Sequence, residues 1–92
     1  MANEVIKKDG RREPFDGDKI RRSIEMASRD AGLPANRVSE ITERVAESAI
    51  QFATDKDEVT TGELRERILT ELNDVEPSVA DAWRRYDETK KK

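Results

Sequence analysis

The sequence of 92 residues predicts an α+β, mainly α fold, in which an N-terminal β-hairpin packs on a bundle of about four helices. Two observations lead to this fold class. A short stretch with a central Asp-Gly pair opens the chain, and four amphipathic stretches with helix-start and helix-stop signals follow it. No internal repeat or low-complexity linker divides the chain. We therefore expect one domain over residues 1–92.

The hairpin is expected over residues 4–15. Asp9-Gly10 is typical of a tight two-residue turn, because both central residues of such a turn need a positive φ. Pro14 cannot donate a hydrogen bond to a neighbouring strand, so it marks the end or edge of the second strand. Two strands alone are marginally stable in water, so the hairpin must lie on apolar side chains. Its expected anchors are Val5, Ile6 and Phe15.

The four helices are predicted from the spacing of their apolar residues and from the residues at their ends. Asp16 or Asp18 can cap the first helix, and Gly32-Leu33-Pro34 stops it. Thr60-Thr-Gly-Glu63 has the form of a capping box at the start of the third helix. Pro77 suits the first turn of the fourth. The predicted helices span residues 17–31, 37–53, 61–74 and 77–89.

The composition excludes several kinds of chemistry. The chain contains neither cysteine nor histidine, which removes disulfides, zinc ribbons, thiol catalysis and the commonest general base. With 34% hydrophobic and 42% charged residues, it can bury only a thin core, so we expect no enclosed active site and no enzyme activity. No long apolar run and no secretion signal are present, which predicts a cytoplasmic protein without a membrane partner.

Charge is unevenly distributed along the chain. Residues 1–22 carry seven basic and five acidic side chains, residues 38–76 carry four and eleven, and residues 84–92 carry five and two. If the two basic ends meet in the fold, they form a local positive site that suits a small anion. Exposed helices of a highly charged protein would give the same distribution without any ligand.

Basic side chains and helix starts supply the candidate phosphate site. Lys7 and Lys8 alternate faces on a strand, so one of them can point toward the groove between hairpin and helices. Lys19 lies in the first turn of a helix and Thr61 at the start of another, where backbone N–H groups favour an anion. Arg65 adds a positive charge one turn later. Without a ligand, the lysines would pair with acids across the strands and the threonine would cap its helix.

The same region could also bind the sugar and base of a nucleotide. Glu13 on the returning strand can accept hydrogen bonds from a sugar hydroxyl or a base amino group, and Phe15 or Ile20 can form an apolar wall for the ring. The glycine patterns of a P-loop and of a dinucleotide-binding fold are absent. A nucleotide bound here would therefore be held in another way.

These residues carry a family resemblance. The run Val5-Ile-Lys-Lys-Asp-Gly10, followed by Pro14-Phe-Asp16 and Lys19-Ile20, resembles the opening of the ATP-cone family. Members are nucleotide-binding regulatory domains of ribonucleotide reductases and of the zinc-ribbon repressors of their genes. Val59-Thr-Thr-Gly-Glu-Leu64 and Ala82-Trp-Arg-Arg-Tyr86 continue the similarity, which covers residues 4–86. After Tyr86 this chain is polar where the family continues with apolar residues.

The resemblance implies a site for ATP or dATP beneath the hairpin, with Mg²⁺ accompanying the nucleotide. It places Lys7 and Thr61 on phosphate, Arg65 near the phosphates, and the segment from Glu13 to Lys19 around the base and ribose. Together with the residues chosen above, the expected nucleotide-binding residues are Lys7, Lys8, Glu13, Pro14, Phe15, Asp16, Lys19, Ile20, Thr61 and Arg65.

The expected function is that of a free-standing, non-catalytic sensor of adenine nucleotides, because neither a reductase domain nor a zinc ribbon is present. Its implied partners are a second copy of the chain, a ribonucleotide reductase or another regulator. One alternative is a nucleic-acid-binding helical module that uses Arg21-Arg22 or Arg84-Arg85, but a pI near 5.1 makes nucleic acid an unexpected partner. Another is a protein-interaction module without a ligand.

Overall fold

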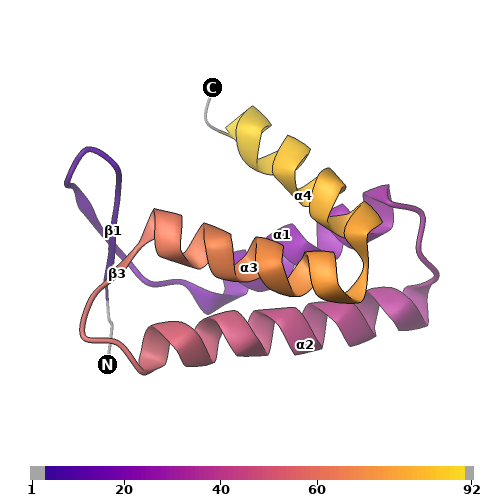
Figure 1. Ribbon diagram of the computed structural model, residues 1–92, viewed down its shortest axis with the longest axis horizontal. Coiled ribbons are helices and arrows are strands. Elements are labelled where there is room, and N and C mark those ends of the chain that lie inside the picture. Colours follow the sequence, from indigo (N-terminus) through magenta and orange to yellow (C-terminus); the bar gives the residue numbers. More distant parts are fainter. Residues whose placement is uncertain (1–3, 91–92) are drawn as a thin grey trace.

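The computed structural model describes the backbone of residues 4–90 and the side chains of residues 4–86. Its elements in chain order are β1 (Glu4–Ile6), β2 (Arg12–Pro14), α1 (Gly17–Asp30), α2 (Ala35–Thr54), β3 (Val59–Thr60), α3 (Thr61–Val75) and α4 (Pro77–Lys90). The predicted fold class, α+β and mainly α, is confirmed. Figure 1 shows the small sheet at one end of the bundle, with α2 and α3 side by side and α4 crossing near α1. No helix among the described residues is long and apolar enough to cross a membrane.

The turn of the hairpin differs from the sequence prediction. Gly10 has a φ of +88°, but Asp9 does not have a positive φ. The Gly10 N–H donates to the Lys7 carbonyl at 2.9 Å, and the Lys7 N–H donates to the Arg11 carbonyl at 2.8 Å. This pattern is a three-residue loop, in which a turn is followed by one left-handed glycine. The Asp9 carboxylate instead accepts from the Arg11 N–H at 3.1 Å and from the Arg11 guanidinium at 2.7 Å, which holds the loop from its polar side.

The helix ends follow the capping signals of the sequence. Asp16 caps α1 by accepting from the N–H groups of Asp18 and Lys19. Gly32, with a φ of +83°, ends α1, and the Leu33 N–H reaches back to the Ser28 carbonyl at 3.3 Å, as in a Schellman motif. The helix α4 begins at Pro77, as predicted.

The start of α2 differs by two residues from the prediction. The helix begins at Ala35, because the carbonyl of Pro34 already accepts from the N–H groups of Arg37 and Val38, each at 3.0 Å. Pro34 has no side-chain cap to offer, but its φ of −67° lies close to the helical value. The backbone therefore enters the helix directly after the proline.

A third strand, β3, was not predicted from the sequence. It runs parallel to β1, with Val5 opposite Val59 and Ile6 opposite Thr60, while β2 pairs with β1 in the antiparallel sense. The strand order is therefore β2-β1-β3, with the N-terminal strand in the middle. Two residues are too few to produce a visible alternation of apolar and polar side chains, which explains why the pattern does not reveal this strand.

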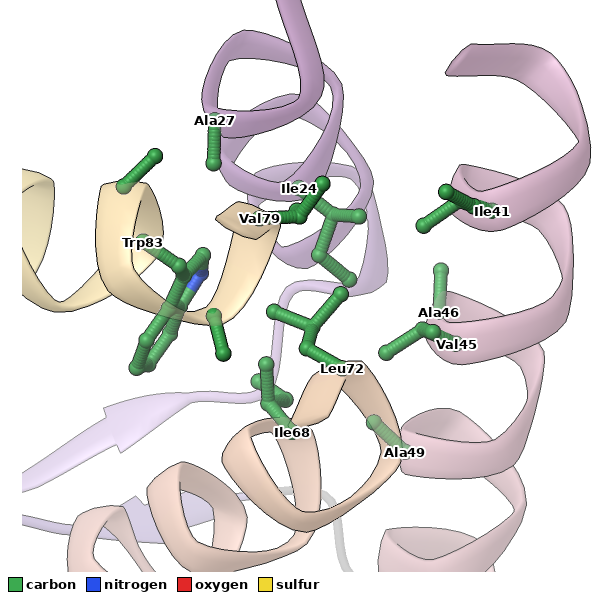
Figure 2. Packing of buried hydrophobic residues seen from close by; sticks show 12 residues of the cluster. Ile24, Ala27, Ile41, Val45, Ala46, Ala49, Ile68, Leu72, Val79 and Trp83 are labelled. Carbon is green, nitrogen blue, oxygen red and sulfur yellow. The ribbon is translucent and has the colours of Figure 1, made fainter. Parts of the chain in front are cut away.

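The apolar interior consists of two clusters. The larger, called here the bundle core, is built by all four helices and is shown in Figure 2, where Leu72 lies near the middle of the labelled side chains. Its buried members are Ile24, Ala27, Ile41, Val45, Ala46, Ala49, Ile68, Leu72, Val79, Ala80, Ala82 and Trp83. The smaller, called the hairpin cluster, holds the sheet against the helices. Its buried members are Val5, Ala53, Val59 and Leu64, with Phe15, Ile20 and Phe52 packed against them.

Candidate functional site

A cavity of about 800 Å³ lies between the hairpin, α1, the start of α3 and α4. In Figure 1 the hairpin tip and the outer half of α4 rise on the same side of the α2–α3 layer. All ten residues that the sequence suggested as nucleotide ligands line this cavity. The fold therefore brings the predicted residues of two distant segments, 7–20 and 61–65, to one cavity, which α4 also borders. Whether these residues bind a nucleotide stays a prediction.

The cavity has an excess of positive charge. Five of its lining side chains are basic and three are acidic. The Lys7 ammonium lies 3.5 Å from the Glu13 carboxylate, so its charge is partly offset by this cross-strand pair. Lys8 and Lys19 have no acidic partner among the residues that the structure describes. These two lysines are consequently the cavity's strongest attraction for an anion.

The N-terminus of α1 contributes less to anion binding than the sequence indicated. The Asp16 side chain accepts from the backbone N–H groups of Asp18 at 3.0 Å and Lys19 at 3.3 Å. Those two N–H groups are thus already occupied by a carboxylate of the protein itself. Of the groups that Lys19 could offer to an anion, only its side-chain ammonium is therefore not bonded to Asp16.

At the start of α3 the two adjacent threonines have different roles. Thr60 is the N-cap: its hydroxyl accepts from the Glu63 N–H at 3.1 Å, and the Glu63 carboxylate accepts from the Thr60 N–H at 3.0 Å. The predicted capping box is thereby confirmed. The hydroxyl of Thr61 has no hydrogen-bond partner among the described residues, and it lines the cavity. A free hydroxyl at a helix N-terminus is well placed for a phosphate oxygen.

The capping box is reinforced by a lysine from the preceding loop. The Lys56 ammonium lies 2.6 Å from the second carboxylate oxygen of Glu63. This contact, followed by the hydrogen bond from the Thr60 N–H, lowers the pKa of Glu63 from its ordinary value of 4.5. A negative charge in the first turn of α3 is favourable for the helix dipole. The helix start beside Thr61 is therefore held in place by three polar groups that do not line the cavity.

Sequence reasoning missed the wall that α4 contributes. Trp83 and Tyr86 line the cavity together with Ser23 of α1. Both aromatic residues were assigned only to the apolar face of their helix, and Trp83 indeed also belongs to the bundle core. Ser23 lies three residues after Ile20 and four after Lys19, so helical spacing placed it on the same face as two predicted residues. This spacing was the signal that could have identified it.

A second hollow, near the C-terminal end of α2, contains none of the predicted site residues. There the Phe52 ring lies between the Lys56 ammonium, 4.9 Å from its centroid, and the Arg67 guanidinium, at 5.5 Å. Both cations have acidic partners, Glu63 and Glu71 respectively. Both basic side chains that line this hollow are therefore already paired with acids.

Comparisons with known proteins identify relatives of the chain. A family model described as the ATP cone domain matches residues 3–92. The transcriptional repressor NrdR of Treponema denticola is 35% identical over 72 residues, which cover 78% of this chain and 48% of the repressor. The NrdR proteins of Pelobacter propionicus and Brucella ovis are 35% and 39% identical, covering 83% and 77% of this chain and 49% and 46% of their own lengths.

The chain spans about half the length of the curated relatives it matches. The family model, in contrast, matches almost the whole chain, from the hairpin to the end of α4. It includes every residue around the cavity. We conclude that the chain belongs to the ATP-cone family.

Proposed function

We propose that this chain is a non-catalytic regulatory module that binds ATP or dATP in the cavity beneath the hairpin. The observation that carries the proposal is the convergence of ten residues, chosen from the sequence alone, on one cavity. Its volume of about 800 Å³ falls within the range of about 300–1,000 Å³ that is usual for small-molecule sites. Family membership supports the same ligand class.

The polar and apolar side chains of the cavity favour different parts of the nucleotide. Lys8, Lys19 and Thr61 offer two ammonium groups and one hydroxyl that have no side-chain partner among the described residues, and these groups can bind phosphate oxygens. Phe15 and Ile20 are half-buried and supply apolar surface for a base, while Glu13 can accept from a hydroxyl or amino group. The phosphates would thus lie between hairpin tip and helix starts.

Magnesium was expected to accompany ATP, but the cavity provides no site for the ion by itself. Its three acidic residues are each engaged elsewhere: Asp9 with Arg11, Glu13 with Lys7, and Asp16 with the N–H groups of α1. Among the described residues, no cluster of three or more carboxylates could hold a metal. A magnesium ion that enters with the nucleotide would be held mainly by phosphate oxygens and water.

A regulatory module must bind its ligand more tightly in one state than in another. The states proposed here are the free chain and the chain associated with a second copy, a ribonucleotide reductase or another regulator. The curated relatives are transcriptional repressors, so the comparisons do not support excluding nucleic acid as a partner. This chain matches only part of them, and its net charge of −3 does not favour direct contact with DNA.

The direct test is calorimetric titration of the chain with ATP, dATP and GTP. We expect the adenine nucleotides to bind, and Lys19→Ala to weaken ATP binding about tenfold, because hydrogen bonds to charged groups are worth about 1.5–3 kcal/mol. Arg22→Ala is the matched control. Arg22 lies on α1 three residues later, is exposed and has no acidic partner among the described residues, but it does not line the cavity.

Other outcomes distinguish the alternatives. Equal losses in Lys19→Ala and Arg22→Ala would indicate attraction to the whole basic surface and contradict a specific site. Tight binding of DNA that weakens steeply with salt would favour the nucleic-acid module. No binding of any nucleotide at millimolar concentration would leave an interaction module without a ligand.

A further inference from the structure

Trp83 belongs to two parts of the molecule at once. Its side chain is only 6% exposed and packs in the bundle core, and it also lines the cavity. Figure 2 shows its ring at the margin of the labelled core side chains. It is the only tryptophan of the chain. A ligand that presses on this ring therefore also acts on the packing of α4 against α1 and α3.

The indole N–H of this ring is hydrogen-bonded to a hydroxyl of α1. The indole N–H of Trp83 donates to the Ser23 oxygen at 3.2 Å, and the Ser23 hydroxyl donates its own proton to the Ile20 carbonyl at 2.9 Å. Because a serine hydroxyl has one proton, the bond to Ile20 leaves the oxygen as an acceptor for the indole. Ser23 is 8% exposed, so water does not easily replace it.

We propose that Ser23 is a positioning residue for the nucleotide cavity, which acts by holding the indole of Trp83 in the orientation that forms the wall on the α4 side. This inference rests on the proposed function. It adds a physical connection between the nucleotide site and α4. A nucleotide that contacts Trp83 would affect the packing of α4, because the ring is hydrogen-bonded to Ser23 of α1. Removal of the hydroxyl leaves the buried indole N–H without a partner, and the ring then turns away from its cavity position.

The test compares two buried serines of the same helix. Ser28 is fully buried and its hydroxyl donates to the Ile24 carbonyl at 2.8 Å, but it neither contacts Trp83 through a hydrogen bond nor lines the cavity. Titration calorimetry with ATP, well below the unfolding midpoint of each variant, should give about tenfold weaker binding for Ser23→Ala, since a lost buried hydrogen bond is worth about 1–3 kcal/mol. Ser28→Ala should bind as the wild type does.

A double-mutant cycle isolates the indole as the intermediary. Trp83→Phe removes the N–H that needs the Ser23 oxygen, so Ser23→Ala should cause no further loss of affinity in that background. Helical circular dichroism verifies that each variant is folded. The emission of Trp83 gives a second measurement: ATP should change it in the wild type and in Ser28→Ala, and should change it less in Ser23→Ala.

Each possible result has a distinct meaning. If the wild type binds ATP while Ser23→Ala binds equally well, or if the two serine variants lose the same affinity, the inference is overturned and the proposed function stands. The inference is also overturned if Ser23→Ala still weakens ATP binding in the Trp83→Phe background. If the wild type binds no adenine nucleotide, the proposed function fails and this inference fails with it.

Discussion

The bundle core and the hairpin cluster are unlike in size and in the way they are supported. Twelve buried residues from four helices make up the bundle core, whereas the hairpin cluster has four buried residues, of which Val5 and Val59 come from the sheet. Both clusters border the cavity, through Trp83 and Ile68 on one side and Val5 and Leu64 on the other. One wall of the proposed site is therefore firmly packed and the other is thinly packed.

Polar contacts and strand pairing give the hairpin side of the cavity additional support. The Arg12 guanidinium of β2 lies 2.9 Å from the Glu58 carboxylate, which precedes β3, and strand pairing joins β1 to both neighbours. Exposed ion pairs of this kind contribute little to stability. The comparison suggests that the bundle keeps the protein folded, while the hairpin depends on backbone pairing and is the wall that a ligand can stabilise most.

The largest effect is expected in the bundle core. Leu72→Ala removes a fully buried side chain that packs among four helices, and should lower the free energy of unfolding by about 2–5 kcal/mol. Urea unfolding followed by circular dichroism measures the loss. Thr70→Ala, an exposed position on the same helix, is the control and should change stability by less than about 0.5 kcal/mol. A loss below about 1 kcal/mol in Leu72→Ala would contradict the assignment of this core as the main source of stability.

A smaller loss of stability, confined to the sheet, is expected for a substitution in the hairpin cluster. Val5→Ala should cost about 1–2 kcal/mol, from roughly two buried methylene equivalents in the thin layer below the sheet. Hydrogen exchange should show faster exchange of the β1 amides and unchanged exchange in the middle of α2. If ATP is added, protection of β1 should rise. Equal acceleration in α2 would mean that the two clusters unfold together, and the comparison would not hold.

The smallest change in stability is expected for the capping box at the start of α3, and it depends on pH. Because the pKa of Glu63 is lowered in the folded state, its charge stabilises the fold above the ordinary value of 4.5, and this contribution is lost as the pH falls through the folded-state pKa. Glu63→Gln should therefore be less stable than the wild type at neutral pH, with the difference shrinking below pH 4.5.

Thermal unfolding across this pH range checks the prediction. Glu66→Gln is the matched control, because Glu66 is an exposed acid of the same helix without an ion pair among the described residues. Its stability relative to wild type should not change in this way with pH. A constant difference between Glu63→Gln and wild type down to strong acid would show that the Lys56 contact does not stabilise the folded carboxylate.

The sequence was informative wherever a structural requirement falls on few neighbouring residues. Asp16, Gly32, and Thr60 with Glu63 provide hydrogen bonds or a left-handed turn at helix ends, and Pro77 lacks an N–H that would be unpaired at the start of α4. Their identity therefore indicates the local structure. The cavity residues of the hairpin and of the two helix starts could likewise be predicted from the sequence, because lysines and a threonine near helix N-termini indicate an anion site.

Features that depend on distant parts of the chain could not be read in the same way. The strand β3 exists only because β1 lies beside Val59 and Thr60, and nothing local distinguishes these two residues from a loop. Trp83 has the spacing of a core residue, and only the packed structure shows that its ring also forms a wall of the cavity. The turn at Asp9 depended on the side-chain contact with Arg11, which propensity alone does not reveal.

The central place of β1 in the sheet also sets the order in which the molecule can be completed. Val5 is synthesised before its partner Val59, which follows only after the sequences of α1 and α2 have been made. Closing so long a loop costs chain entropy that local helix formation does not. The parallel pairing of β1 with β3 therefore waits until α1 and α2 have been synthesised, whereas β1 and β2 can already pair as a local hairpin.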